Sequence, residues 1–381
     1  MRSPMFYKPN ILRRVLIAAG ITAAALALVF LANFIASYYF NQKPEVPVND
    51  QPTVTPLNFE LEPGISYENA ANESALYFYS AENMKIVNTS GASVEDISLK
   101  MSHPTASCKG NFALFYDVGG RTTATFNGTK QVGSMELEEN IALASVNAGG
   151  YALIVTAGDM YKCAVRVYTP DGKEIFKWNS GNLSVVAADI ADNNKDITVS
   201  AVNTDGATVN TQIIMFNIAK EKPFANDTYE AKLYPIVCYS GGYTYCIGST
   251  ETLIYNSYGK CVSTAVYDDR VLLSYALDGD LFALAFSGST ETPGAYAEIK
   301  TYTHKGDESG SFTCRQEFDF LEAKDGSLAL NDGRTISILN SHCREKQQLT
   351  LGFDLRNFVF FGNAHKGVGI TASGAELIQL N

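Results

Sequence analysis

The chain has 381 residues and a formal net charge of −11, with 29 Lys and Arg against 40 Asp and Glu. This acidic balance, without a basic patch, excludes the usual electrostatic basis for binding nucleic acid or anionic lipid headgroups. Charged residues make up only 18% of the chain while Gly, Tyr and Phe number 30, 21 and 21, a composition typical of short strands joined by tight turns.

The first predicted element is an apolar, uncharged run over residues 15–40, which follows a short basic tail at residues 1–14. About 20 apolar residues in a helix span the ~30 Å hydrocarbon core of a membrane. The run is longer than the apolar region of a secretory signal, and bulky Phe34 spoils the best cleavage site, which ends at Ala36. We therefore predict an uncleaved transmembrane helix over residues 15–40.

The charges beside this run predict its orientation. The tail carries four basic residues and no acidic one: Arg2, Lys8, Arg13 and Arg14. The positive-inside rule then predicts a cytoplasmic N-terminus in a cell membrane and a C-terminal region outside the cytoplasm. That outer region carries a net charge of −15.

A proline-rich stretch, residues 41–56, separates the apolar run from the rest of the chain. Its prolines are Pro44, Pro47, Pro52 and Pro56. Closely spaced prolines in a polar setting favour extended polyproline geometry, so we predict a linker that holds a domain away from the bilayer. The extracytoplasmic domain then comprises residues 57–381.

One strand pattern recurs along this domain. Residues 151–157 (YALIVTA) form an apolar run, 163–168 (CAVRVY) form a second, and the turn Pro170-Asp171-Gly172 leads to a third. The second strands of such units are expected to begin near Ala75, Phe112, Tyr151, Ile197, Tyr243, Leu281, Leu328 and Gly367. A four-stranded unit repeated every 37 to 47 residues is typical of a β-propeller. We predict an all-β propeller of eight blades, with seven as the alternative because the first unit is the faintest.

The last unit lacks a fourth strand, since the chain ends after its third. Residues 57–61 (LNFEL) alternate apolar and polar side chains, as a half-buried edge strand does. We predict that this segment supplies the missing strand and closes the ring, which removes an exposed sheet edge.

The seven cysteines are dispersed, without the C-x-x-C pair typical of zinc sites. Cys238 and Cys246 flank a hairpin turn at Gly241-Gly242 and form the one candidate disulfide. The alternative is that they are small buried hydrophobic residues, as we expect of the other five.

Three patterns approach a chemical motif without completing it. Ser257-Tyr-Gly-Lys260 matches S-x-x-K but lies on a predicted hairpin turn, where the motif requires a helix. The acidic loop at residues 192–196 lacks the glycine and the bidentate glutamate of a calcium loop. The acidic clusters Glu136, Glu138, Glu139 and Asp268, Asp269 contain the carboxylates that a sugar-cleaving acid and base require. Carboxylates adjacent on a strand point to opposite faces, so no pair is assigned, and we expect these clusters in turns that connect blades. We therefore assign no catalytic, cofactor-binding or metal-binding residue and expect no enzyme activity.

The segment Val167-Tyr-Thr-Pro-Asp-Gly-Lys-Glu-Ile-Phe-Lys-Trp178 resembles a repeat of pyrroloquinoline-quinone-type propellers, in which a D-G-K-x-x-W run closes each blade. That group includes quinoprotein dehydrogenases and an outer-membrane assembly scaffold that binds no cofactor. Trp178 is the only Trp in the chain, so the docking tryptophan of the other blades is missing. We therefore expect no quinone cofactor.

The order of basic tail, single span, proline-rich linker and degenerate propeller is similar to that of an uncharacterised bacterial family, domain of unknown function 5711. This resemblance covers most of the chain and implies no activity or residue roles. We expect a membrane-anchored binding or scaffolding protein whose partner is a membrane or cell-envelope protein, or a cell-wall polymer. The alternative is a protein that binds or cleaves cell-wall glycan.

Overall fold

The computed structural model describes residues 53–57, 61–62, 65–158, 160–206, 208–220, 222–288, 294–332, 334–371 and 374–380. The predicted tail and transmembrane helix, residues 1–40, lie outside these ranges, as does most of the predicted linker. Every regular element within them is a strand, and none of the helices needed to cross a membrane occurs there.

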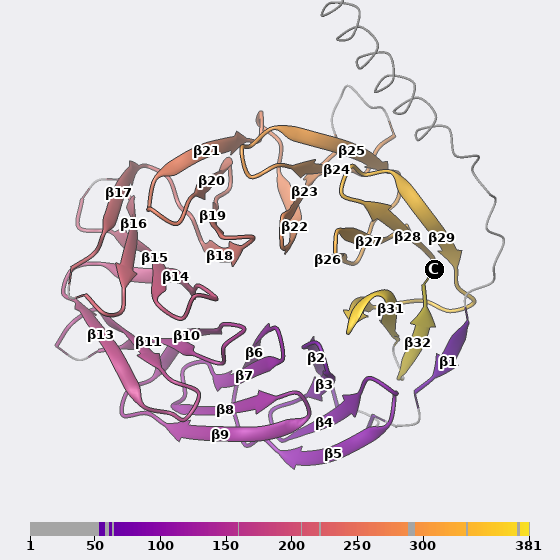
Figure 1. Ribbon diagram of the computed structural model, residues 1–381, viewed down its shortest axis with the longest axis horizontal. Helices are drawn as coiled ribbons and strands as arrows, with labels where there is room; N and C mark the ends of the chain where they lie inside the picture. The colour runs from indigo at the N-terminus through magenta and orange to yellow at the C-terminus, as the bar shows by residue number, and fades with distance from the viewer. Residues whose placement is uncertain are drawn as a thin grey trace, which may run out of the picture. The chain divides into compact units, whose positions relative to one another are not determined.

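Eight sheets of four antiparallel strands stand around a central channel, each forming one blade of a β-propeller (Figure 1). The innermost strands are β2 (Glu68–Ala71), β6 (Pro104–Lys109), β10 (Ile141–Val146), β14 (Ser184–Ile190), β18 (Ile236–Ser240), β22 (Leu272–Asp278), β26 (Leu321–Lys324) and β30 (Asn357–Phe361). The second strands are β3 (Ala75–Tyr79), β7 (Phe112–Asp117), β11 (Ala152–Ala157), β15 (Asp196–Asn203), β19 (Tyr243–Ile247), β23 (Leu281–Ser287), β27 (Ser327–Asp332) and β31 (Asn363–Ile370). The predicted eight-bladed, all-β fold is confirmed.

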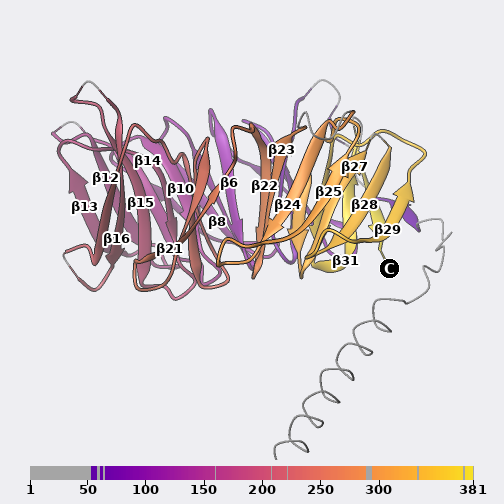
Figure 2. The same cartoon turned by 90° about the horizontal axis from the view of Figure 1, so that it is seen from above.

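The outer half of each blade completes the ring. The third strands are β4 (Asn83–Asn88), β8 (Thr122–Asn127), β12 (Cys163–Tyr168), β16 (Asn210–Asn217), β20 (Glu251–Tyr255), β24 (Ala297–Tyr302), β28 (Thr335–Asn340) and β32 (Ala375–Gln379). The outermost strands are β5 (Ser93–Ser98), β9 (Lys130–Glu136), β13 (Glu174–Ser180), β17 (Ala225–Glu230), β21 (Cys261–Val266), β25 (Glu308–Cys314), β29 (Glu345–Thr350) and, for the eighth blade, β1 (Val54–Pro56). Figure 2 shows the ring edge-on, with strands running between its two flat ends.

The predicted starts of the second strands agree with the structure to within one residue for seven blades. The exception is the eighth, where β31 begins at Asn363 and not at Gly367 because the chain turns at Gly362, whose φ is 84°. These strands were recognisable because both of their faces are buried against neighbouring blades. All five residues of β3 are buried, for example, whereas five of the six residues of β5 are exposed.

A common turn joins the third and fourth strands of five blades. It occurs at Asn88–Gly91, Thr169–Gly172, Asn256–Gly259, Thr303–Gly306 and Asn340–Cys343. In each, the backbone N–H of the last residue donates to the carbonyl of the first over 2.8–3.0 Å, and the last residue has a positive φ. The turn that carried the resemblance to quinone-type propellers in one blade is thus an internal repeat.

β1 lies against β32 and closes the ring (Figure 1), so the N-terminal end of the domain completes the last blade. Val54 pairs with Ile378, and the N–H of Leu57 donates to the carbonyl of Ala375 over 3.0 Å. The closing strand therefore lies three residues before the predicted segment, 57–61, of which residues 58–60 are outside the described ranges. Pro56 is compatible with this position because one side of an edge strand has no neighbouring strand, so the N–H that proline lacks is not needed there for a hydrogen bond.

Removing β1 is expected to destabilise the propeller. A chain beginning at residue 58 loses the β1–β32 pairing and the burial of Leu57, which is only 7% exposed and packs in one cluster with Phe78 and Val368. We expect its free energy of unfolding to fall by at least about 2 kcal/mol relative to a chain beginning at residue 53. Urea unfolding followed by Trp178 fluorescence measures the difference. Equal midpoints for the two chains would contradict closure by β1.

Candidate functional site

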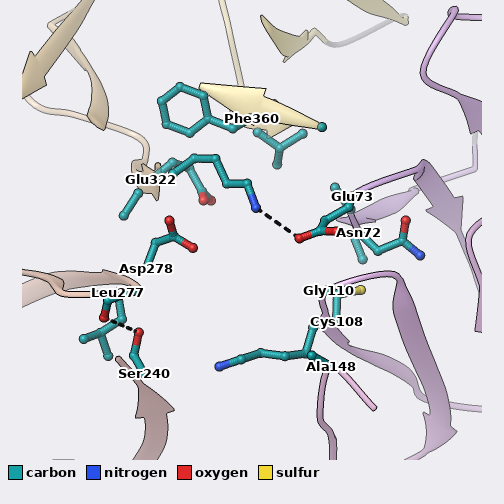
Figure 3. A pocket seen from close by; sticks show the side chains of 18 of the residues that line it. Asn72, Glu73, Cys108, Gly110, Ala148, Ser240, Leu277, Asp278, Glu322 and Phe360 are labelled. Atoms are coloured by element: carbon teal, nitrogen blue, oxygen red, sulfur yellow. Dashed lines mark hydrogen bonds and ion pairs between the residues drawn. The ribbon is translucent and has the colours of Figure 1, made fainter. Parts of the chain in front are cut away.

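One end of the central channel opens into a cavity of about 570 Å³ that all eight blades line (Figure 3). The innermost strands, and the turns that join them to the second strands, form its wall. We call it the channel-mouth cavity. Several residues of the innermost strands that line the cavity are small, such as Ala70, Ala106 and Ala323. Their side chains fill little of the channel and so leave the cavity open.

Most charged groups at this cavity already have partners. Lys324 Nζ lies 3.6 Å from Glu73 Oε1, which joins blade 7 to blade 1. The backbone N–H of Asp325 donates to Asp278 Oδ2 over 2.7 Å, which joins blade 7 to blade 6. Lys109 Nζ donates to the carbonyl of Tyr239 over 2.5 Å. This last contact links blades 2 and 5, so the Lys109 amine is part of the channel wall.

The half-buried Asp189 on β14 supports the same region. Its Oδ2 accepts the N–H of Tyr239 over 2.8 Å, and its Oδ1 accepts the N–H of Ile190 over 2.9 Å. Burial raises the pKa of Asp189 to about 6, although the nearby charge of Lys109 and the two backbone donors favour the ionised form. Asp189 therefore has a structural role in fixing β18 against β14.

Glu322 on β26 is the exception among the acidic residues of the cavity. Within the described residues it has no hydrogen-bond or ion-pair partner, although its side chain lines the cavity next to Asp278 (Figure 3). The Glu322 side chain is half-buried, because part of it is exposed to the cavity. The protein atoms around the rest of the side chain exclude water that would solvate its charge. This burial raises the pKa of Glu322 to about 7.

The opposite end of the ring carries exposed apolar side chains. Antiparallel strands place the second-to-third turns and the connections between blades at the end away from the channel-mouth cavity. Blades 4 to 6 present six large apolar side chains there, which we call the apolar rim: Val209, Leu233, Val266, Val271, Leu273 and Tyr296. Val271 is 62% exposed and Val266 is 55% exposed. The rim was not apparent from the sequence because its residues lie in separate turns and strand ends of three blades.

The loops that approached chemical motifs are turns in the structure. Asn256 Oδ1 accepts the N–H groups of Tyr258 and Lys260, which places the S-x-x-K match on the β20–β21 hairpin as predicted. In the acidic loop, Asp192 Oδ1 accepts the N–H of Ala148 over 2.9 Å and joins blades 3 and 4. No three His, Cys, Asp or Glu side chains in the described ranges are grouped so that they could hold a metal ion.

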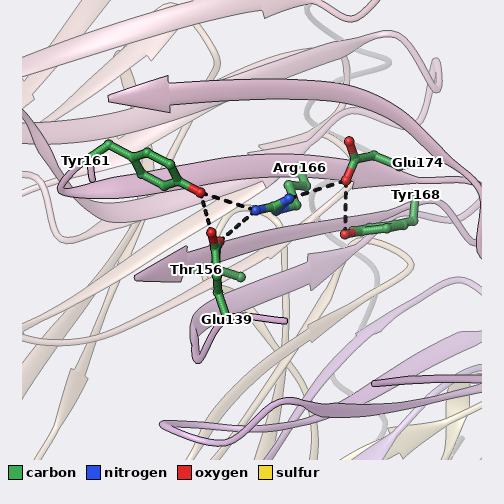
Figure 4. Close-up of polar contacts among 6 residues, drawn as sticks. All are labelled: Glu139, Thr156, Tyr161, Arg166, Tyr168 and Glu174. Carbon is green, nitrogen blue, oxygen red and sulfur yellow. Dashed lines mark hydrogen bonds and ion pairs between the residues drawn. The ribbon is translucent and has the colours of Figure 1, made fainter. Parts of the chain in front are cut away.

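The acidic cluster near Glu139 contains an ion-pair network that the sequence did not reveal (Figure 4). Arg166 Nη2 lies 2.6 Å from Glu139 Oε2, which also accepts the hydroxyl of Thr156 over 2.6 Å. Tyr161 donates to the other carboxylate oxygen, and Glu174 contacts the far side of the guanidinium at 3.5 Å. A cavity of about 370 Å³ lies beside this network.

The other four acidic residues of these clusters make no side-chain hydrogen bond or ion pair within the described part of the chain. Glu136 and Glu138 line the same cavity, and both are exposed. Asp268 and Asp269 lie in the connection between β21 and β22, with φ values of 50° and 62°. The network was not apparent because its cation, Arg166, is 27 residues from Glu139 and is brought to it by β12.

The candidate disulfide between Cys238 and Cys246 is not formed, and all seven thiols are free. The predicted hairpin exists, but its register pairs Val237 with Cys246 and Cys238 with Tyr245. Adjacent residues of a strand point to opposite faces, so Cys238 and Cys246 lie on different faces of the sheet. Burial raises the pKa of the Cys238 thiol to about 12 and that of Cys246 well above its ordinary value.

The fold defines the chain as an eight-bladed β-propeller with a closed ring. The chain belongs to a family of unknown function, DUF5711, whose model matches residues 62–380. Among curated proteins, none matches the sequence.

Two solved structures illustrate the likeness in fold. BamB from Moraxella catarrhalis is 12% identical, with a TM-score of 0.51 over 86% of this chain and 98% of that chain. The C-terminal WD40 domain of Sif2 is 8% identical, with a TM-score of 0.59 over 87% of this chain and 99% of that chain. At such identities the likeness concerns the fold alone.

The Glu139 network predicts a specific acid sensitivity. Burial raises the pKa of Glu139, but the hydrogen bonds from Thr156 and Tyr161 and the charge of Arg166 outweigh it and lower the pKa below the ordinary value of 4.5. A lowered folded-state pKa contributes stability that is present above the unfolded pKa and is lost as the pH falls through the folded value. Glu139→Gln should therefore be less stable than the parent at pH 7, and the difference should shrink below about pH 4.5.

Urea unfolding at pH 7 and at pH 3.5 measures this difference, with Glu138→Gln as the matched exposed control. An equal loss of stability for Glu139→Gln at both pH values would show that the carboxylate charge is not the source of the effect.

Proposed function

We propose that this chain is a membrane-anchored protein whose propeller lies outside the cytoplasm and holds a partner protein of the membrane or cell envelope at the apolar rim. The protein acts by binding and carries out no chemical step of its own. The observation that carries the proposal is the gathering of six exposed apolar side chains over three consecutive blades at one end of the ring.

An apolar rim suits a protein partner because exposed apolar side chains gain free energy when another surface covers them. Contiguous exposed apolar patches on soluble proteins mark interaction sites, and scattered single residues do not. Each rim residue lies in a turn or near the end of a strand, and the neighbouring strands are paired within a blade. Because the backbone at these positions is already ordered, binding costs little backbone conformational entropy.

The proposed location rests on the residues before the propeller. The apolar run at 15–40 is long enough to cross a bilayer, and the four basic residues before it favour a cytoplasmic N-terminus. The acidic charge of the rest of the chain suits a domain that does not itself lie on an anionic membrane surface.

Protease treatment of intact cells that express the full chain tests this location. A C-terminal tag should sediment with membranes and be removed by added protease, while an N-terminal tag should be protected until the cells are permeabilised. Protection of the C-terminal tag in intact cells would refute the proposed orientation.

Charged substitutions in the rim test the binding surface. We expect Val266→Asp with Val271→Asp to weaken capture of the partner by about tenfold or more, because a buried carboxylate must be desolvated without a compensating cation. Val94→Asp with Val262→Asp is the matched control, since these residues are 48% and 42% exposed at the other end of the blades.

Affinity capture from membranes, quantified by mass spectrometry for each variant, measures the effect. Equal losses for both double variants, or retention of cell-wall glycan in place of protein, would contradict the proposal.

A further inference from the structure

The channel-mouth cavity has the size and enclosure of a small-molecule site. Pockets for small ligands commonly have volumes of 300–1,000 Å³ and combine apolar walls with a few polar groups. This cavity measures about 570 Å³, and its wall includes apolar surface from Leu277, Val359 and Phe360. It lies at the end of the ring away from the apolar rim, so a ligand there leaves the rim free.

The charges of the cavity favour a cation. Four acidic residues line it, Glu73, Asp192, Asp278 and Glu322, against two basic residues, Lys109 and Lys324. Both amines already have acceptors, namely the carbonyl of Tyr239 and the carboxylate of Glu73. The wall therefore offers an anionic ligand no unoccupied cationic side chain within the described residues.

Glu322 is the group that a cation would satisfy. A carboxylate in a desolvated site without a partner costs free energy, and an opposite charge placed beside it recovers that cost. Glu322 on β26 and Asp278 on the neighbouring inner strand β22 both face the cavity (Figure 3). Asp278 has one oxygen bound by the N–H of Asp325, which leaves its second oxygen for a ligand.

The form of the cavity favours an organic cation over a metal ion. A metal ion needs several ligand atoms at about 2–2.6 Å, and no suitable group of three His, Cys, Asp or Glu exists within the described residues. An alkyl ammonium ion needs only one or two carboxylates for its head. Its chain gains free energy by covering the apolar wall.

We propose that the channel-mouth cavity binds a small organic ligand through a primary ammonium group, held by Glu322 and Asp278, with its alkyl part against Leu277 and Phe360. This is a second binding function, distinct from the proposed partner surface on the apolar rim. Binding does not require that surface, so either proposal can fail without the other.

The acidity of Glu322 makes the binding depend on pH. The charged groups that share the cavity with Glu322 are Glu73, Lys109, Asp192, Asp278 and Lys324, and Asp189 lies outside the lining. The pKa of Glu322 is raised to about 7, so its carboxylate is about nine-tenths ionised at pH 8 and about one-tenth ionised at pH 6. Asp189, whose pKa is about 6, is fixed by backbone donors and does not face the ligand.

Isothermal titration calorimetry on the detergent-solubilised full chain tests the proposal, with n-butylamine as the probe and butyrate as the matched anion. We expect saturable binding of butylamine at pH 8, about tenfold weaker binding at pH 6, and no binding of butyrate. Glu322→Gln should weaken butylamine binding at pH 8 by about tenfold or more and abolish its pH dependence.

Asp278→Asn keeps the oxygen that accepts the N–H of Asp325 and should weaken binding to a smaller extent. Glu95→Gln, on the exposed strand β5, should bind as the parent does. Melting temperatures of all variants establish that they are folded. No saturable heat with butylamine at pH 8, stronger binding of butyrate, or unchanged binding by a folded Glu322→Gln would each overturn the proposal.

Discussion

The pairing of β1 with β32 completes the eighth blade and closes the ring. Each blade buries its two faces only against its neighbours, so an open ring leaves two large apolar faces in water. Closure also brings together residues more than 300 positions apart, at an entropic cost that grows only slowly with loop length. Three residue pairs, Val54 with Ile378 through Pro56 with Glu376, and the packing of Leu57 stabilise that junction. Hydrogen bonds from Asn357 to Asn69 and from Lys366 to the carbonyl of Thr89 also join blades 8 and 1.

The closed ring gives its two ends different chemistry. The turns between first and second strands converge on the channel, where residues from all blades line one cavity and five blades contribute acidic or amide side chains. The other end carries the apolar rim, which belongs to blades 4 to 6. A ligand site and a partner surface can therefore occupy one rigid body without competing for residues.

Much of the fold was predictable because blade burial leaves a strong local signal. The second strands are continuous apolar runs with glycine turns beside them, so Ala75, Phe112, Tyr243 and Leu281 were located to the residue. The closing strand was misplaced because the prolines before Leu57 suggested a linker, whereas an edge strand tolerates Pro56.

The sites were far less predictable. The channel-mouth cavity is built from short groups of residues in all eight blades. Glu322 lies in a stretch of four residues (LEAK) whose position on an inner strand only the ring reveals. The register of the β18–β19 hairpin, which separates Cys238 from Cys246, likewise depends on a one-residue choice. Such features arise from long-range pairing and leave no local pattern.

Site-specific photo-cross-linking in living cells tests the central claim, that the apolar rim is the surface that holds a protein partner, most directly. A photoreactive amino acid replaces Val271 on the rim in one strain, and Tyr258, which is 86% exposed at the opposite end, in another. We expect one discrete cross-linked protein from position 271 and none from position 258. A cross-link from position 258 with none from position 271 would contradict that claim.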